Sequence, residues 1–188
     1  MKTEERKPEH MTSLYGNRLV PKTHARIAFR GLIDTLQAEV IEAQVLASGL
    51  GEAEICAKLG EILDYLRDLM AAEVKETLLM PPFLFGMDAE EIQRQSHDAF
   101  TRDAEGKPVL PDYTHGPVVA RLNMLRAKTR EAELLAVKVF GPEGANDAGH
   151  SPHEREDIVL ALNRLSSALW WLTCQRQNKP WPGRPRCG

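Results

Sequence analysis

The sequence predicts an all-α protein, an antiparallel up-and-down bundle of about five helices. Apolar residues recur at the three-and-four spacing of a half-buried helix in four long stretches, and glycine and proline signals separate these stretches. No stretch alternates with the two-residue period of a strand, and no segment repeats. A chain of 188 residues with 43% hydrophobic content has the size of one domain.

The first two helices are expected to form a hairpin. Residues 23–48 carry one apolar stripe, and Gly49 and Gly51 end it. The same period resumes at Ile55 and continues to about residue 79, before a pair of prolines. The short glycine connection predicts that the two helices run antiparallel.

The second half of the chain predicts three more helices. A short polar helix is expected over 88–97, and a long one over 118–139. The last long helix should begin at Ser151, Pro152 and Glu154, which fit an N-cap, a first-turn proline and a capping-box acid, and run to about residue 175. The expected organisation is an N-terminal segment 1–22, a bundle domain 23–177 and a disordered tail 178–188 rich in proline and glycine.

Composition excludes several classes of partner. A net charge of −3 gives no field that would attract nucleic acid or an anionic membrane surface. The polar opening MKTEERKPEHM and the absence of any run near the ~20 apolar residues that span a bilayer predict a cytoplasmic protein. The three cysteines are widely spaced, and His10, His97 and His115 lack ligand spacing, so no protein metal site is expected.

A few polar residues inside the helical stretches are candidates for a site. Arg126, Arg130 and Glu133 stand at i, i+4 and i+7, in one row beside the apolar stripe, where two guanidinium groups could bind a polyphosphate. The alternative is a solvated flank that pairs with neighbouring charges. Asp34 lies within an apolar stretch and needs a cation, for which Arg130 is a plausible partner.

The last helix offers a similar choice. Asn163 and Ser166 interrupt its apolar run ALNRLSSALWW, and such polar groups need a ligand or a structural hydrogen bond between helices.

Three separated segments resemble the ATP:cob(I)alamin (corrinoid) adenosyltransferases. TSLYGNRLVPKTHARIAFRGLIDTL is similar to the opening of these enzymes, LNMLRAKTREAE to their arginine-rich helix, and ALNRLSS to their N-R-L-S signature. Three segments resemble the ethanolamine-utilisation branch more than the propanediol branch: GMDAEEIQRQSHDAF, KPVLPDYTHG and RLNMLRAKTREAE. The likeness spans roughly residues 12 to 174.

The resemblance implies a reaction between two substrates in a helical bundle. The 5′-deoxyadenosyl group of ATP, bound with Mg²⁺, moves to the cobalt of cob(I)alamin or another corrinoid, and triphosphate leaves. The matched ATP positions are Thr12, Ser13, Lys22, Arg126, Glu133 and Asn163. Asp34 would form an ion pair with Arg130 that shapes the site, and Arg126, Asp34 and Arg130 are the positions assigned to catalysis.

The resemblance also implies an apolar wall under the corrin, which excludes water and removes the lower cobalt ligand. The candidates are loop residues whose alternative role is core packing: Phe83, Phe85, Val109, Leu110 and Tyr113. Trp170 and Trp171 are assigned to the core or to an interface.

One segment departs from the family pattern. EERKPEHM stands where the family carries a glycine-rich phosphate loop, so residues 1–22 form only a partial ATP-binding loop. This departure leaves two alternatives open, a non-catalytic corrinoid-binding or delivery protein and a helical scaffold subunit. The expected assembly is a homo-oligomer, a trimer or dimer, with a corrinoid reductase or a B12-dependent enzyme as a further partner.

Overall fold

The computed structural model describes residues 7–16, 18–100, 102, 105–141 and 155–181. In chain order, its elements are strands β1 (Met11–Tyr15) and β2 (Arg18–Pro21), helices α1 (Ala25–Gly49), α2 (Ala53–Lys75) and α3 (Ala89–Asp98), the 3-10 turn η1 (Tyr113–His115), and helices α4 (Pro117–Phe140) and α5 (Glu156–Gln177).

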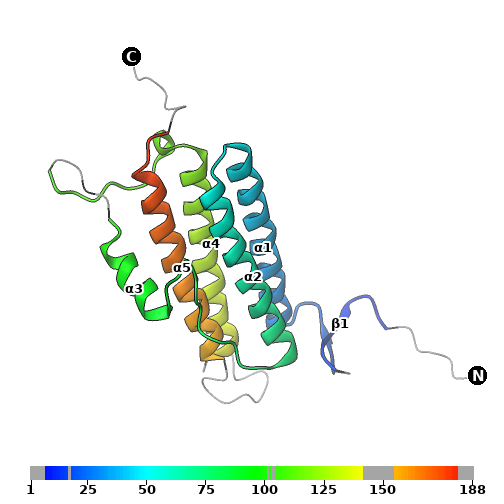
Figure 1. Cartoon of the computed structure of the whole chain (residues 1–188). Coiled ribbons are helices and arrows are strands. Elements are labelled where there is room, and N and C mark those ends of the chain that lie inside the picture. Colours follow the sequence, from blue (N-terminus) through cyan, green and yellow to red (C-terminus); the bar gives the residue numbers. More distant parts are fainter. Residues whose placement is uncertain (1–6, 17, 101, 103–104, 142–154, 182–188) are drawn as a thin grey trace, which may run out of the picture.

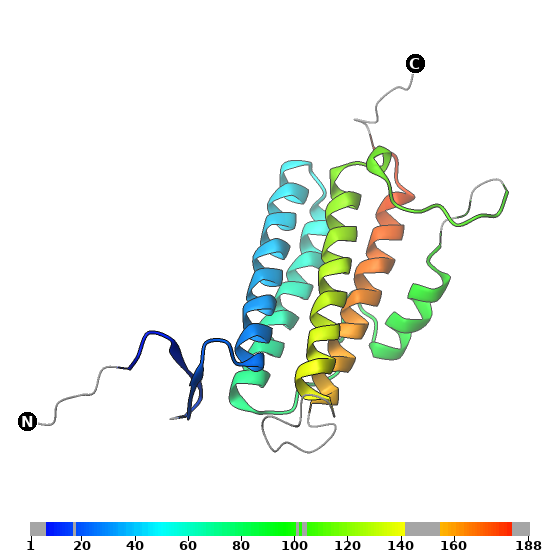
Figure 2. The same cartoon turned by 180° about the vertical axis from the view of Figure 1, so that it is seen from behind.

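Within these residues, α1, α2, α4 and α5 form an up-and-down bundle, which confirms the predicted fold class (Figures 1 and 2). Helix α1 packs between α2 and α4, α4 packs on α5, and the short α3 lies on the outer side of α5. The core is built from the apolar stripes that the sequence predicts, with Phe29 and Ile33 of α1 fully buried. No helix of the described part has the length and apolar character needed to cross a membrane.

The N-terminal segment folds as a small antiparallel hairpin that the sequence analysis does not predict. Strands β1 and β2 pair in the register Met11↔Pro21, Thr12↔Val20 and Ser13↔Leu19, with an irregularity before Tyr15. Gly16 takes a positive φ of 49° in the turn. The dipeptide Gly16–Asn17 between two apolar runs was the available hairpin signal. The hairpin extends from the α1 side of the bundle, away from α3 and α5 (Figures 1 and 2).

Helix α2 ends at Lys75, before the predicted limit near Leu79, so the prolines do not terminate it. Glu76 takes a left-handed φ of 55°, and Thr77 N–H donates to Ala72 O at 3.0 Å. A guanidinium from the start of α5 completes this end, because Arg155 donates to the carbonyls of Ala72 and Thr77 at 3.3 and 3.1 Å. Leu79 lies beyond the end of the helix and is nevertheless buried, at 6% exposure.

The later helices agree with the prediction except at one boundary. Helices α3 and α4 occupy the expected stretches, and the Asp88 carboxylate caps α3 by accepting from Glu90 N–H and Glu91 N–H at 3.0 and 2.8 Å. Helix α5 begins at Glu156. The predicted cap at Ser151, Pro152 and Glu154 lies outside the described residues.

The first residues of the expected tail, 178–181, are described and packed. Lys179 Nζ donates to Glu54 at 2.9 Å. The Trp181 ring lies against Gly116, where a Cβ would come within 2.6 Å of the indole and where φ is +91°. Only glycine fits that position beside the start of α4. Residues 182–188 lie outside the described part.

A buried ion cluster joins α1 to the end of α2. The Glu73 side chain is 0% exposed, and its carboxylate accepts from Arg26 Nε at 2.6 Å and from Arg30 Nε. Arg26 also donates to the Glu76 carboxylate at 2.8 Å and to the Glu73 carbonyl at 3.0 Å. Burial lowers the pKa of Arg26, but the bonds to Glu76 and Glu73 outweigh burial and raise it overall.

Replacing Glu73 by Gln should lower the free energy of unfolding by about 3–5 kcal/mol, because two buried arginines would lose the counter-charge that they share and Arg26 would keep only the partly exposed Glu76. Asp64→Asn is the matched control on the same helix, since the Asp64–Arg67 pair is exposed and contributes little. Urea unfolding followed by circular dichroism measures both variants. Equal stability of the two variants would contradict a structural role for the Glu73 cluster.

Acid should weaken the contact between α5 and the segment after α2. Burial raises the pKa of Asp157, but bonds from Arg155 and from Leu79 N–H outweigh it, so the pKa lies below its usual value. The stability from this carboxylate is therefore present above its unfolded-state pKa of about 3.9 and is lost as the pH falls through the lower folded-state pKa. The difference in unfolding free energy between wild type and Asp157→Asn should shrink below about pH 5; a constant difference down to pH 2 would argue against this.

Candidate functional site

Two guanidinium groups on α4 face outward without a carboxylate partner among the described residues. Arg126 is half-buried, its Nε donates to Asn123 Oδ1 at 3.1 Å, and its guanidinium lies 5.4 Å from the centre of the Trp170 ring. Arg130, one turn further on, is exposed. Burial lowers the pKa of Arg126, and the nearby charge of Arg130 lowers it further. This repulsion would be relieved by a bound anion.

A polar network lies on the same side of the bundle and joins three helices. The Asn163 side-chain Nδ2 donates to Glu133 Oε1 at 2.8 Å, and the Asn163 side-chain Oδ1 accepts from Arg164 Nη1. Arg164 Nη2 reaches Gln93 on α3 at 2.7 Å, while its Nε is buried without a partner. Asn163 and Glu133 are therefore held in fixed orientations between α4 and α5, as candidate ligand groups must be.

The Ser166 hydroxyl does not join this network. It donates to the carbonyl of Asn163 in its own helix at 2.9 Å. The two polar residues in α5 therefore have different partners. Ser166 bonds to the backbone of its own helix, whereas Asn163 bonds to Glu133 of α4.

Asp34 does not pair with Arg130 within one chain, contrary to expectation. It lies on the exposed side of α1, between the buried Ile33 and Leu36, and neither a hydrogen bond nor an ion pair joins it to Arg130 among the described residues. The inference from the apolar stretch was wrong because a residue next to a buried position on a helix points about 100° away from it.

The three remaining ATP candidates belong to the hairpin. Thr12 and Ser13 lie on β1, and Lys22 directly follows β2, with its N–H bonded to His10 O at 2.9 Å. The Ser13 and Lys22 side chains are exposed. One chain thus presents the ATP candidates as two groups, one on the hairpin beside α1 and one on α4 and α5 (Figure 1).

The five corrinoid candidates differ in how far they are buried. Phe85 takes a positive φ of 59° and stacks on Trp171 with ring centres 5.7 Å apart. Val109 is half-buried, and its carbonyl accepts from Gln177. Side chains in the same loops remain exposed, at 69% for Phe83, 65% for Leu110 and 71% for Tyr113. These three are free to contact a ligand.

Two residues beyond the predicted set, Trp170 and Arg164, belong to this region. Trp170 supports Arg126 and also meets Phe100 edge-on at 5.4 Å. It stands seven residues after Asn163, and this spacing places both on one helix face, so the signal was available. No comparable signal connects Arg164 to Gln93, because the docking of α3 on α5 is a tertiary contact.

The described residues contain no group of three His, Cys, Asp or Glu side chains close enough to hold a metal ion.

Comparison with solved structures finds the same fold. A variant of a PduO-type ATP:corrinoid adenosyltransferase from Lactobacillus reuteri, complexed with cobalamin and ATP, superposes with a TM-score of 0.64 at 18% identity, over 87% of this chain and 86% of that one.

Sequence comparison finds closer relatives. The corrinoid adenosyltransferase EutT of Salmonella typhimurium is 30% identical over 165 residues, and the EutT protein of Escherichia coli is 30% identical over 168 residues. Each match covers 88% of this chain and 58% of the relative, so the chain spans less than two thirds of their length. The family model described as cobalamin adenosyltransferase matches residues 3–175. The chain therefore belongs to the cobalamin adenosyltransferase family, with its similarity to EutT proteins agreeing with the ethanolamine-utilisation branch.

Proposed function

We propose that this protein transfers the 5′-deoxyadenosyl group of ATP to the cobalt of cob(I)alamin or a related corrinoid and releases triphosphate. The observation that carries the proposal is the Arg126 and Arg130 pair on α4, which repel each other and have no carboxylate partner among the described residues. The family membership supports this reading.

The α4 and α5 residues would bind the nucleotide. Arg126 and Arg130 would hold the triphosphate of Mg-ATP and stabilise its charge as it leaves. Glu133 and Asn163, fixed to each other at 2.8 Å, would accept from and donate to the ribose. Trp170, whose ring centre lies 5.4 Å from the Arg126 guanidinium, would hold that guanidinium in place through a cation–π contact.

The hairpin would complete the site from another copy of the chain. Thr12, Ser13 and Lys22 lie on the α1 side of the bundle, whereas Asn163 belongs to α5 on the other side of α4. A homo-oligomer, a dimer or a trimer, would bring one copy's hairpin to its neighbour's α4 and α5. The exposed apolar side chains of α1 and α4 support such an assembly: Ile41, Val45, Met124, Leu134 and Val137. An ATP-dependent reaction also fits a cytoplasmic location.

The corrinoid would be bound by the segments that precede α3 and α4. Phe83, Leu110 and Tyr113 offer exposed apolar surface, while Phe85 and Val109 would support these segments from behind. Apolar contact below the corrin would keep water from the cobalt. Asp34, exposed on α1, would meet Arg130 only across a subunit contact.

The reaction itself tests the proposal. Full-length protein mixed with Mg-ATP and chemically reduced cob(I)alamin should give the light-sensitive absorption spectrum of adenosylcobalamin and one triphosphate for each corrinoid consumed. Corrinoid binding without this product would favour the non-catalytic binding protein, and absence of corrinoid binding at micromolar concentration would favour the scaffold subunit.

Arg126→Ala should weaken ATP binding by about 10- to 100-fold, because it removes charge-assisted hydrogen bonds to phosphate. Arg94→Ala is the matched control, since Arg94 is an exposed arginine on α3 paired with Glu91. Isothermal calorimetry with Mg-ATP measures both variants. Equal ATP affinity of the two variants would contradict the proposal that the triphosphate binds at Arg126 on α4.

A further inference from the structure

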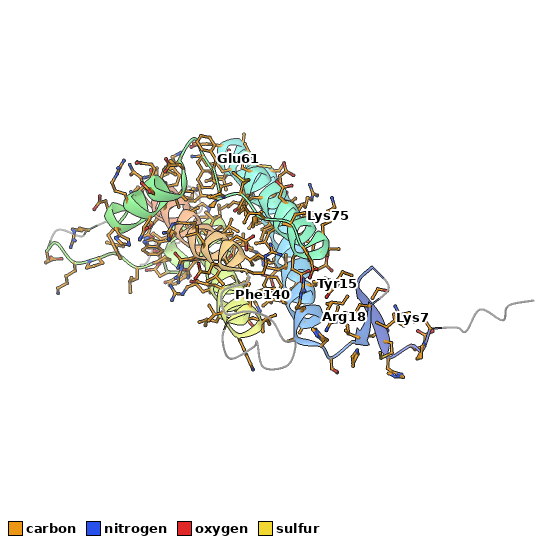
Figure 3. The ribbon with its side chains drawn as sticks, turned by 90° about the horizontal axis from the view of Figure 1, so that it is seen from below. Lys7, Tyr15, Arg18, Glu61, Lys75 and Phe140 are labelled. Carbon is orange, nitrogen blue, oxygen red and sulfur yellow. The ribbon has the colours of Figure 1, made fainter. Side chains whose placement is uncertain are left out.

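The hairpin is attached to the buried ion cluster through one aromatic ring. Tyr15, at the end of β1, lies with its ring centre 5.7 Å from the Arg26 guanidinium carbon. The same guanidinium lies 5.8 Å from the ring centre of Phe140, the last residue of α4. Figure 3 shows Tyr15 between the hairpin and the end of the bundle that holds Phe140. Arg26 thus contacts the hairpin, α2 and α4 together.

Arg26 has little freedom to move. Its Nε and Nη2 both bond to Glu73, at the carboxylate and the carbonyl, and its Nη1 bonds to Glu76 at 2.8 Å. The side chain is 8% exposed and the Glu73 side chain is 0% exposed. An arginine fixed by several bonds in its own plane leaves its flat faces for aromatic rings. The guanidinium is therefore a rigid support for Tyr15.

Tyr15 is also locked to the second strand. Its hydroxyl accepts from Arg18 Nη1 at 2.7 Å, and the Arg18 guanidinium lies 5.5 Å from the ring centre. Arg18 begins β2, so this contact closes the hairpin beside its turn. Tyr15 is half-buried, and the buried side chains of the two strands are Leu14 and Val20, at 1% and 5% exposure.

We propose that Tyr15 and Arg26 are positioning residues, which hold the hairpin so that Thr12, Ser13 and Lys22 meet the phosphates of ATP. The inference rests on the proposed function for its ligand, but the attachment of the hairpin does not. Neither residue needs to touch ATP, because each acts through the orientation of the strands. A hairpin of two short strands is only marginally stable by itself. The Glu73 cluster would therefore stabilise its position through Arg26.

Hydrogen exchange of the full-length protein, without nucleotide, tests the attachment. In Tyr15→Ala, amides of β1 and β2 should exchange about tenfold faster than in wild type, because the cation–π contact is lost, while amides of α1 and α4 keep their rates. Tyr15→Phe is the matched control, because it keeps the ring over Arg26 and removes only the hydroxyl bond to Arg18. Its strand amides should exchange clearly more slowly than those of Tyr15→Ala. Calorimetry on the same proteins should give a several-fold weaker Mg-ATP affinity for Tyr15→Ala only.

Each outcome decides one part of the inference. Unchanged strand exchange in Tyr15→Ala would overturn the attachment, since Leu14 and Val20 would then hold the hairpin by themselves. Faster exchange with unchanged ATP affinity would overturn the positioning role. If wild type binds no ATP, the positioning role falls with the proposed function, and the exchange rates still decide whether Tyr15 attaches the hairpin.

Discussion

The packing at one end of the bundle, where α1 begins and α2 and α4 end, depends on the Glu73 carboxylate. This carboxylate is fully buried between Arg26 and Arg30. An unpaired carboxylate could not remain there, and two unpaired arginines could not either. Their bonds fix the distance between α1 and the end of α2. The contact of Arg26 with Phe140 extends that constraint to α4, so three helices and the hairpin share one electrostatic support.

The sequence predicts the bundle well because helix formation and burial leave a repeating pattern. Phe29, Ile33 and Leu36 lie in the stripe and in the core alike. The hairpin is different, since two strands of five and four residues are too short to show alternation. The early end of α2 is also hidden from the sequence, because the side chain that completes it belongs to Arg155, 83 residues after Ala72.

The candidate site is predicted in its parts and not in its assembly. Spacing places Arg126, Arg130 and Glu133 on one side of α4, and the structure joins Glu133 to Asn163 as neighbours. An apolar stretch taken as a whole does not tell that Asp34 faces solvent and not Arg130, because a step of one residue from the buried Ile33 turns the side chain by about 100°. Nor can spacing tell that the hairpin and α5 lie on different sides of one chain.

The end of α2 has a consequence for the order in which the chain folds. The carbonyls of Ala72 and Thr77 find their donors on Arg155, and Leu79 N–H finds its acceptor on Asp157. These partners lie some eighty residues later in the chain. The local cap at Glu76 and Thr77 can form as soon as α2 forms. The bonds from Arg155 and Asp157 are added only when α5 docks, which makes them a late, non-local event in folding.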